Sequence, residues 1–570
     1  MSAHRVLGAS VVAVALLAGC ASVPTSGPIQ QGAVVVAAGN DQFIRVIPHE
    51  PVADMTPEEI VAGFQEATAA SEAGYETARS YLTSSASSSW RPEAGIQIYD
   101  AAGLTTTSKA GSVIEEGALS ARIDADWQYG VVAPAKRTQW KYSLVRVDGQ
   151  WRIADLPQGL VLGPGAIARG YRSADLYFFT RDFGTLVPAP VTIPFSASGL
   201  ATQLVSGLLA GPTSWIAPAV RTAFPEGTRL ALGSVPVVDG VAEVQLTREV
   251  LNADDATRQK LSAQLVWTLR QLPEVNGVRI TINGQALSVT SVPSVQPIGS
   301  WATYDPDALP PSSKGYAVGP KGLVAFSPDG TSATPVSFRT TLRSPAISLD
   351  STRIAGLSAD RRQLYVGQFV EGGSASVRYT GADLSRPTWD GSVGAPAGGS
   401  VWVAEPGKGL VHITDEGAEV VPVSSAPAGF SDGDIIAAAM SRDATRMAML
   451  VRRGTLIEPW LARIERNGSS VAVSTPVRVD GEISDALDLA WANADTLDVL
   501  GTSGASSLEV VEIGVGSPRV RHVSAPDAAV TALAAAPGRV TLTAQADAVW
   551  RQSPPVWARI PDLSQPVYPG

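Results

Sequence analysis

A repeat in the C-terminal half of the chain limits the possible folds more than any other feature of the sequence. Over residues 311–570, short apolar segments recur, each followed by a turn and a second apolar segment. The spacing is 42, 51, 51 and 44 residues, measured between Ile347, Trp389, Met440, Trp491 and Ala535. A β-propeller blade contains four strands in about 40 to 50 residues. The repeat therefore predicts an all-β propeller of about five or six blades, in which sequence from both ends completes one blade; a pair of β-sandwiches is the alternative.

Residues 195–293 have the pattern of a small two-layer α/β domain. Leucines at helical spacing predict a first helix. Two strands are expected within 229–246, joined by the hairpin dipeptide Asp239-Gly240. A longer helix opens at Asp254, and a further strand turns at Asn283-Gly284. The predicted order is α-β-β-α-β-β, which packs as helices on one sheet.

Residues 53–165 predict an α+β domain of the NTF2-like type. Thr56-Pro57-Glu58-Glu59 is a capping box that opens a helix, and Asp148-Gly149 is a hairpin turn within a later run of alternating strands. Such a domain packs helices on one face of a curved sheet, where aromatic side chains fill the core or line a pocket. We expect a core role for Trp127, Tyr129, Trp140 and Trp151. Residues 166–194 are expected to be a connecting strand or linker, and residues 294–310 a linker.

The N-terminus has the features of a bacterial lipoprotein signal. A weakly basic start precedes an uncharged apolar run of 13 residues at positions 6–18, which Gly19 and Cys20 follow. A membrane-spanning helix needs about 20 residues, so this run is too short to cross a bilayer. We predict a signal peptide over residues 1–19, cleavage before Cys20, and S-diacylglyceryl and N-acyl modification of Cys20. Residues 20–52 are then a lipidated tether that anchors the protein to the extracytoplasmic face of the cell membrane.

Charge and composition exclude several classes of function. The chain has 53 acidic and 43 basic residues, a net charge of −10, and this balance argues against a nucleic-acid partner because phosphate binding needs clustered Lys and Arg. Cys20 is the only cysteine, so a mature fold with a lipidated Cys20 has no disulfide. No later stretch contains 18 consecutive uncharged apolar residues, so the lipid alone is expected to hold the protein at the membrane.

We find no catalytic, cofactor-binding or metal-binding constellation and predict that the protein is not an enzyme. His49, His412 and His522 fall in separate regions, and none is spaced as a metal ligand. Asp124 and Asp126 have the spacing of residues on one strand face, and a solvated face is their expected role because glycoside hydrolysis needs carboxylates on both sides of a cleft. The sequence contains no Gly-x-Ser-x-Gly elbow and no Walker A loop.

Several blocks of sequence resemble one family. Leu208-Leu209-Ala210-Gly211-Pro212, Phe224-Pro225-Glu226-Gly227-Thr228 and Leu265-Val266-Trp267-Thr268-Leu269 look like a GerMN domain. Together with Val147-Asp148-Gly149-Gln150-Trp151 and Tyr171-Arg172-Ser173-Ala174-Asp175, they make the whole chain resemble the actinobacterial lipoprotein LpqB family. The resemblance implies a non-catalytic lipoprotein that binds the extracytoplasmic sensor domain of the MtrB histidine kinase. It further implies modulation of the MtrA-MtrB two-component system, which controls cell-envelope homeostasis and division.

A glycan-binding or hydrolytic propeller in the cell wall is the alternative function. Propellers host many hydrolases, so the fold does not exclude this class. The alternative requires acidic or histidine side chains that converge on the central channel from several blades, together with exposed aromatic rings that stack on sugars. The aromatic residues of the repeat are instead expected in blade cores, and they are Trp389, Trp402, Trp460, Trp491 and Trp550.

Overall fold

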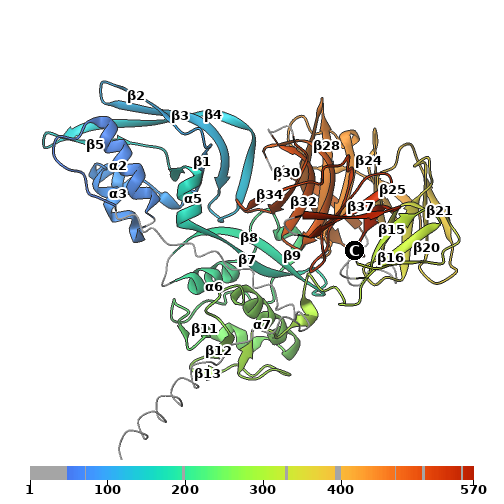
Figure 1. The fold of residues 1–570 in the computed structure, drawn as a ribbon. Coiled ribbons are helices and arrows are strands. Elements are labelled where there is room, and N and C mark those ends of the chain that lie inside the picture. Colours follow the sequence, from blue (N-terminus) through green and yellow to red (C-terminus); the bar gives the residue numbers. More distant parts are fainter. Residues whose placement is uncertain are drawn as a thin grey trace, which may run out of the picture. The chain divides into compact units, whose positions relative to one another are not determined.

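The computed structural model describes residues 48–70, 72–195, 199–327, 331–391, 399–468, 470–479, 481–503, 507–553 and 556–570 (Figure 1). These residues belong to one compact unit, Val46–Gly570. Cys20, the predicted signal peptide and most of the predicted tether lie outside the described residues, so those assignments stay predictions. None of the helices within the described ranges combines the length and the apolar character that a membrane crossing requires.

The first domain packs helices against a six-stranded sheet, as predicted for an NTF2-like α+β fold. Its helices are α2 (Pro57–Ala69), α3 (Glu76–Ser80), α4 (Ser84–Ser89) and α5 (Pro164–Gly170). Its strands are β1 (Ile96–Tyr99), β2 (Thr105–Lys109), β3 (Ser112–Ile123), β4 (Tyr129–Val147), β5 (Gln150–Asp155) and β6 (Leu160–Leu162). The sheet order is β5-β4-β3-β1-β6, with β2 paired to β3.

Local sequence signals explain how this domain begins and turns. The capping box is present, because the Thr56 hydroxyl accepts from the Glu59 N–H and the Glu59 carboxylate accepts from the Thr56 N–H. Asp148 and Gly149 both have positive φ in the β4–β5 turn, as a two-residue hairpin turn requires. Trp140 is buried in the core, whereas the other three aromatic residues of the expected set are only partly buried.

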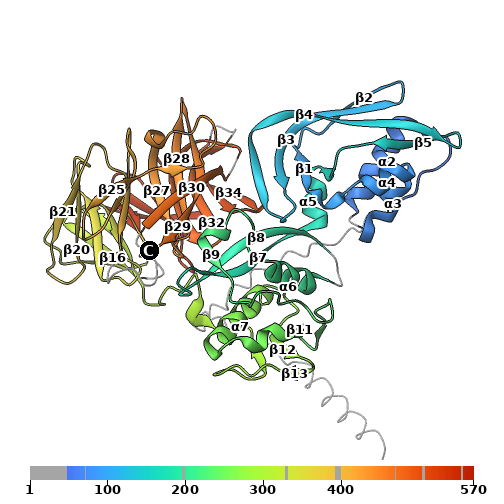
Figure 2. The same ribbon diagram turned by 180° about the vertical axis from the view of Figure 1, so that it is seen from behind.

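The second domain holds two helices in contact with a long hairpin and with a second sheet. The hairpin strands are β7 (Tyr171–Thr180) and β8 (Leu186–Pro194), and β9 (Val220–Arg221) pairs with β7. The helices are α6 (Leu200–Ala210) and α7 (Asp255–Leu269), and both pack against β7 (Figures 1 and 2). The second sheet contains β10 (Val237–Val238), β11 (Val241–Leu246), β12 (Gly277–Ile282), β13 (Gln285–Ala286) and β14 (Val295–Pro297).

The structure places part of the connecting strand or linker expected at 166–194, and part of the linker expected at 294–310, inside this domain. One hydrophobic core runs from Ala174 to Val289 and includes Phe178, Phe179 and Leu186, so the hairpin within residues 166–194 is part of the domain. Nearly every residue of β8 is buried, because both faces of the strand are covered. A strand covered on both faces lacks polar alternation and is hard to assign from sequence. On the other side, β14 joins the second sheet.

Two smaller differences have local causes. The expected strand over 229–238 shrinks to the two residues of β10 plus a bridge from Leu230, since Gly233 adopts positive φ and Pro236 has no N–H to donate. Gly163 is the N-cap of α5, which begins at Pro164 and whose Ile167 packs in the first domain's core. Part of the segment expected to be a connecting strand or linker therefore forms a short helix.

The third domain is a propeller of six blades in its described residues. Four blades are separate four-stranded sheets, and the other two are joined, with one extra strand, in a nine-stranded sheet. Blade 1 contains β15 (Gly315–Gly319), β16 (Gly322–Phe326), β17 (Ala333–Pro335) and β39 (Ser564–Val567). Blade 2 contains β18 (Arg343–Ile347), β19 (Arg353–Leu357), β20 (Gln363–Gln368) and β21 (Ala375–Thr380). Blade 3 contains β22 (Thr388–Trp389), β23 (Val401–Glu405), β24 (Gly409–Ile413) and β25 (Ala418–Val421), and β26 (Val423–Ser424) pairs with β30.

The remaining blades follow the same plan. Blade 4 contains β27 (Ile435–Met440), β28 (Arg446–Arg453), β29 (Leu456–Asn467) and β30 (Ser470–Arg478). Blade 5 contains β31 (Ile483–Asn493), β32 (Thr496–Ser503), β33 (Glu509–Gly514) and β34 (Val520–Ser524). Blade 6 contains β35 (Ala532–Ala534), β36 (Leu542–Ala544), β37 (Ala548–Ser553) and β38 (Val556–Pro561).

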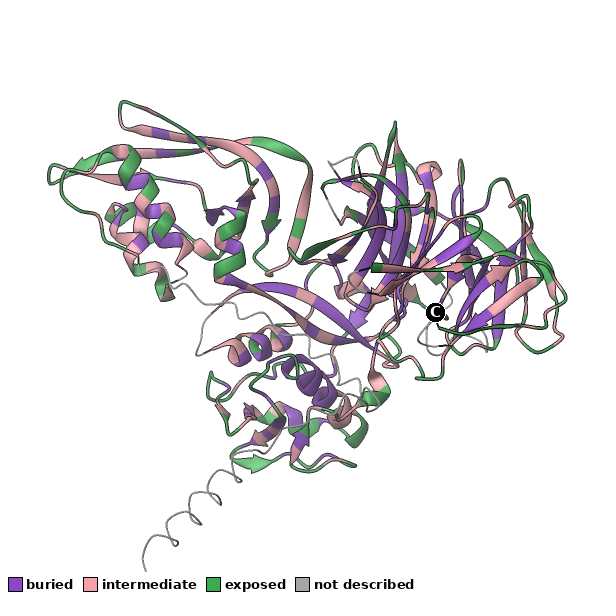
Figure 3. Cartoon of the chain, in the orientation of Figure 1, coloured by how far each residue is buried: buried purple, intermediate pink, exposed green. Residues whose placement is uncertain are grey.

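The sequence repeat coincides with the inner ring of the propeller. The strands β39, β18, β22, β27, β31 and β35 contact one another in succession, so each is the innermost strand of its blade. Four of the five repeat markers lie on these strands, and Ala535 directly follows β35. Strand β39 pairs with β15 through Tyr316 and Val567, which confirms that sequence from both ends completes one blade. Buried residues fill these blades as they fill the cores of the other two domains (Figure 3).

Candidate functional site

The structure keeps the histidines apart. The main-chain oxygen of His49 accepts from the Tyr81 hydroxyl, and His522 lies on β34 with its Nδ1 atom 3.2 Å from Glu509. His412 lies on β24 in blade 3. Within the described ranges, no group of three or more His, Cys, Asp or Glu side chains is arranged to hold a metal ion.

His412 is part of the packing of blade 3. Its ring stacks on Trp402 with the centroids 4.4 Å apart, and its Nε2 atom lies 2.7 Å from the Ser400 hydroxyl. Burial lowers the pKa of His412, although the carboxylates of Glu419 and Asp390 oppose this shift. The imidazole is therefore neutral near pH 7 and completes a buried polar contact.

Asp124 and Asp126 lie in the turn after β3, and the expected strand face is wrong for this pair. The Asp124 carboxylate accepts hydrogen bonds from the main-chain N–H groups of Asp126 (2.9 Å) and Gln128 (3.0 Å). Short polar side chains commonly hold turns by such contacts. Asp124 is therefore occupied by its own turn.

The central channel of the propeller is narrow. Its cavity measures about 70 Å³ and is lined mostly by small or apolar residues, among them Ala346, Ala438, Met440, Leu489 and Ala534. Two arginines, Arg386 and Arg442, also reach it, and none of the described side chains that line it is a carboxylate or an imidazole.

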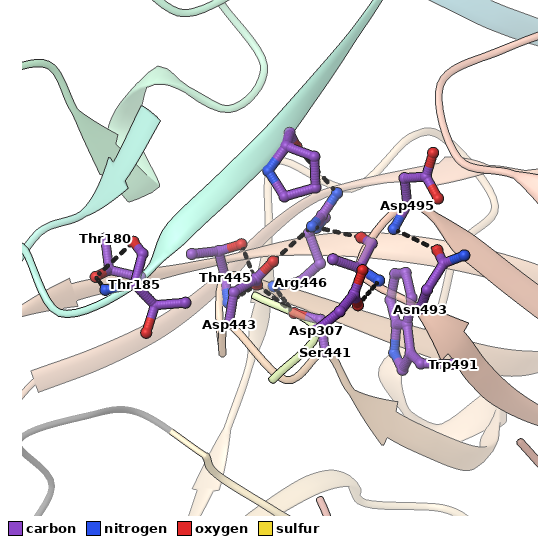
Figure 4. Close-up of polar contacts among 12 residues, drawn as sticks. Thr180, Thr185, Asp307, Ser441, Asp443, Thr445, Arg446, Trp491, Asn493 and Asp495 are labelled. Atoms are coloured by element: carbon purple, nitrogen blue, oxygen red, sulfur yellow. Dashed lines mark hydrogen bonds and ion pairs between the residues drawn. The ribbon is translucent and has the colours of Figure 1, made fainter. Parts of the chain in front are cut away.

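The most elaborate polar site lies where blade 4 begins its second strand (Figure 4). Asp443 accepts hydrogen bonds from the Ser441 hydroxyl (2.6 Å), the Thr445 hydroxyl (2.6 Å) and the Thr445 N–H (2.9 Å). Its second oxygen forms an ion pair with Arg446 at 2.6 Å. Burial raises the pKa of Asp443, but Arg446 and the hydroxyl donors outweigh it, so the pKa stays below its usual range. Asp443 is thus held as a carboxylate.

Arg446 connects three parts of the chain. Its guanidinium donates to the main-chain oxygens of Ala494 in blade 5 (2.8 Å) and Pro188 in β8 (3.3 Å), in addition to its pair with Asp443. It also lies over the Trp491 ring, 5.5 Å from the centroid. The arginine therefore ties two neighbouring blades to the hairpin of the second domain, and we call this contact the Arg446 junction.

Sequence reasoning missed this junction, although a signal for part of it exists. The pattern Ser-x-Asp-x-Thr-Arg occurs at residues 348–353 and again at 441–446. In both copies the arginine lies over a tryptophan of the next blade: Arg353 over Trp389 and Arg446 over Trp491, each at 5.5 Å. The two indole N–H groups donate back to the preceding blade. Only the second copy reaches another domain.

A cluster of acids surrounds the junction. Asp495 pairs with Arg519 at 2.6 Å, and Asp307 accepts from the Ala494 N–H at 2.7 Å. Burial raises the pKa of Asp307 to about 6. Burial first, and then the neighbouring Asp495, raise the pKa of Asp175 on β7 to about 7. The contact between the second domain and the propeller therefore includes a carboxyl whose raised pKa places its titration near neutral pH.

A second set of contacts joins the same two domains. The Trp215 indole donates to the main-chain oxygen of Thr475 at 3.1 Å, and Arg463 donates to the main-chain oxygen of Trp215. These contacts attach the loop after α6 to β29 and β30. The second domain is thus bound to blades 4 and 5 by main-chain acceptors, which sequence patterns do not reveal.

The folds define a multidomain propeller protein, and comparison with known proteins gives its family. Family models match residues 50–167 (lipoprotein LpqB, N-terminal domain), 175–288 (sporulation and spore germination, Germane) and 322–569 (lipoprotein LpqB β-propeller domain). The chain is 30% identical to the lipoprotein LpqB of Thermobifida fusca over 97% of this chain and 97% of that protein. It is 30% identical to the lipoprotein LpqB of Streptomyces coelicolor over 99% of this chain and 98% of that protein. The chain belongs to the lipoprotein LpqB family.

Solved structures are similar to single parts of the chain. The first GerMN domain of the sporulation protein GerM from Bacillus subtilis is 28% identical and covers 22% of this chain and 92% of that chain, with a TM-score of 0.19. TolB from Acinetobacter baumannii is 12% identical and covers 58% of this chain and 88% of that chain, with a TM-score of 0.35.

Proposed function

We propose that this protein is anchored through a lipid on Cys20 to the extracytoplasmic face of the cell membrane. There it binds the sensor domain of an MtrB-type histidine kinase and modulates an MtrA-MtrB two-component system. Membership of the lipoprotein LpqB family supports the lipoprotein part of the proposal, and the resemblance noted in the sequence suggests the partner. The protein acts by binding and not by catalysis.

The Arg446 junction is the observation that carries this proposal. We take the central face of the propeller and the surface of the second domain, which the Germane model matches, as the partner-binding surfaces. Arg446 joins these two domains through Pro188 and Ala494. A ligand shifts a kinase between two states only if it binds one state more tightly. Two surfaces held in one geometry discriminate between two arrangements of a partner better than two surfaces that move independently.

A binding titration tests the proposal. A chain from Ala21 to Gly570 contains the whole compact unit and is titrated against the purified extracytoplasmic domain of the cognate kinase. We expect saturable binding, and weaker binding by Arg446→Ala. The sensor domain of an unrelated histidine kinase is the control and should not bind. Absence of binding to the cognate domain at concentrations of about 1 mM, where even a weak complex forms, would contradict the proposal.

A further inference from the structure

A cleft of about 530 Å³ lies between the first domain, the Germane domain and blades 4 and 5. This volume falls in the range of small-molecule sites, which is about 300–1,000 Å³, and such sites favour domain interfaces. Much of its wall is apolar, and the apolar lining includes Pro188, Pro190, Trp215, Ile216, Leu461 and Val477. Val477 is 38% exposed, so part of its side chain is open to solvent at this wall.

Main-chain contacts hold the walls of the cleft in place. The Trp215 indole is fixed by its hydrogen bond to the Thr475 oxygen. Gly516 packs so closely on Pro190 that an added Cβ would lie 2.7 Å from the proline ring. Because these walls are fixed by short contacts, the cleft is formed before any ligand arrives, and binding does not need to order it.

The charged groups of the cleft are predominantly cationic. Arg122 is exposed on its rim and has no hydrogen-bond or ion-pair partner among the residues that the structure describes. Arg446 is 1% exposed, and its Nε atom is buried without a hydrogen-bond partner in the described chain. Arg463 also reaches the cleft, but Glu465 already pairs with it. The one acidic side chain in the lining, Asp124, accepts with one of its oxygens from the N–H groups of its own turn.

We infer that this cleft binds an amphiphilic anion, a molecule with an apolar body and one carboxylate or phosphate group. A purely polar anion would leave the apolar wall in contact with water, and a neutral apolar molecule would leave the Arg122 guanidinium without an anionic partner. Guanidinium groups bind carboxylate and phosphate through charge-assisted hydrogen bonds. The inference goes beyond the proposed kinase binding and does not depend on it.

Calorimetric titration of the chain from Ala21 to Gly570 tests the ligand class. The probes are dodecanoate and dodecyl phosphate, used below their micelle concentrations, with dodecanol and inorganic phosphate as the matched neutral and polar compounds. We expect one saturable site for at least one amphiphilic anion, and binding of dodecanol and inorganic phosphate weaker by about tenfold or more. The ratio of the dissociation constants of dodecanoate and dodecyl phosphate shows whether the site prefers a carboxylate or a phosphate. Equal binding of dodecanol, or no saturable binding of either anion, would overturn the inference.

Paired variants locate the site. Val477→Asp places a carboxylate on the apolar wall, and Arg122→Glu reverses the charge on the rim; each should weaken anion binding by about tenfold or more. The controls are Val556→Asp on the exposed outer strand β38 and Lys109→Glu on β2, which make the same changes outside the cleft and should leave binding within about twofold. Unchanged binding by both cleft variants, with unchanged circular dichroism, would place the ligand elsewhere and overturn the assignment. Kinase binding is measured in the absence of amphiphile. The proposed kinase binding and the inferred anion site can therefore be refuted independently of each other.

Discussion

Asp443 and Arg446 form an ion pair of 2.6 Å in which the two side chains are 0% and 1% exposed. A buried pair adds little net stability relative to apolar residues, but loss of one partner leaves a charge buried without compensation. The pair lies at the start of β28, where the propeller meets the Germane domain. Its geometry therefore bears on both stability and function.

Removal of one partner of this ion pair should lower the stability of the fold. We expect Arg446→Ala to lower the free energy of unfolding by about 3–5 kcal/mol, because Asp443 then stays buried without its cation. Chemical denaturation followed by circular dichroism measures the change. The control is Arg137→Ala, whose side chain is 85% exposed and pairs with Glu116, and which should cost under about 1 kcal/mol. Equal losses for the two variants would contradict the buried role of Arg446.

Gly516, at the contact between β8 and blade 5, should not tolerate a larger side chain. Gly516 and Gly538 have φ values of 66° and 64°, so an alanine at either position is strained by about 1 kcal/mol. At Gly516 the new Cβ would also lie 2.7 Å from Pro190, whereas at Gly538 nothing lies within 4 Å. We expect Gly516→Ala to cost about 1–3 kcal/mol more than Gly538→Ala. The same unfolding midpoint for the two variants would show that β8 and blade 5 do not pack as described.

Glu115 should make stability depend on pH. It is 5% exposed in the first domain, and burial raises its pKa from 4.5 to about 7, although Tyr142 and Gln65 oppose the shift. The folded state therefore binds a proton that the unfolded state has released, so this contribution is full below about pH 4.5 and is lost as the pH rises to about 7. We expect Glu115→Gln to gain roughly 3 kcal/mol relative to wild type between pH 4.5 and pH 8. Denaturation of both proteins at the two pH values measures this gain.

The same experiment has a matched control in the neighbouring residue. Glu116 lies on the opposite face of β3, and the Gln139 side chain lowers its pKa. Glu116→Gln should therefore not reproduce the gain at high pH. If wild type and Glu115→Gln lose stability in parallel as the pH rises, Glu115 is not the titrating group.

Lipidation predicts a cellular phenotype for one substitution. Cys20→Ser removes the thiol that would accept the diacylglyceryl group, so the protein should leave the membrane fraction or remain unprocessed. Fractionation and intact-mass measurement of the cellular protein check this outcome. Normal processing with full membrane retention would rule out Cys20 as the anchor.

The parts of the fold that follow from local patterns were predictable from sequence. The capping box at Thr56 and Glu59 satisfies helix N–H groups with nearby side chains, and Asp148-Gly149 supplies the positive φ values of a hairpin. The propeller repeat was visible because each inner strand needs an apolar marker such as Trp389 or Trp491 in the same register. These signals depend only on residues close in sequence.

The parts of the fold that depend on contacts between segments far apart in the sequence were not predictable from it. Strand β8 has no polar alternation because other elements cover both of its faces, and the residues expected to be a linker therefore form part of a core. The Arg446 junction joins Arg446 to the main-chain oxygen of Pro188, 258 residues away. A main-chain oxygen can accept a hydrogen bond whatever the side chain of its residue, so the sequence gives no sign of this contact. The repeated Ser-x-Asp-x-Thr-Arg pattern is visible in the sequence and marks a shared turn, but it does not indicate the partner of Arg446 in another domain.

The activity of the kinase itself is the most direct test of the proposed regulatory role. The full-length cognate kinase is reconstituted in lipid vesicles with the lipidated wild-type protein or with Arg446→Ala, and its autophosphorylation rate is measured. We predict that the wild-type protein changes the rate in a saturable way and that Arg446→Ala, which loosens the junction, produces a smaller change at the same surface density. A rate that stays unchanged over the full range of wild-type protein density would contradict the proposed role.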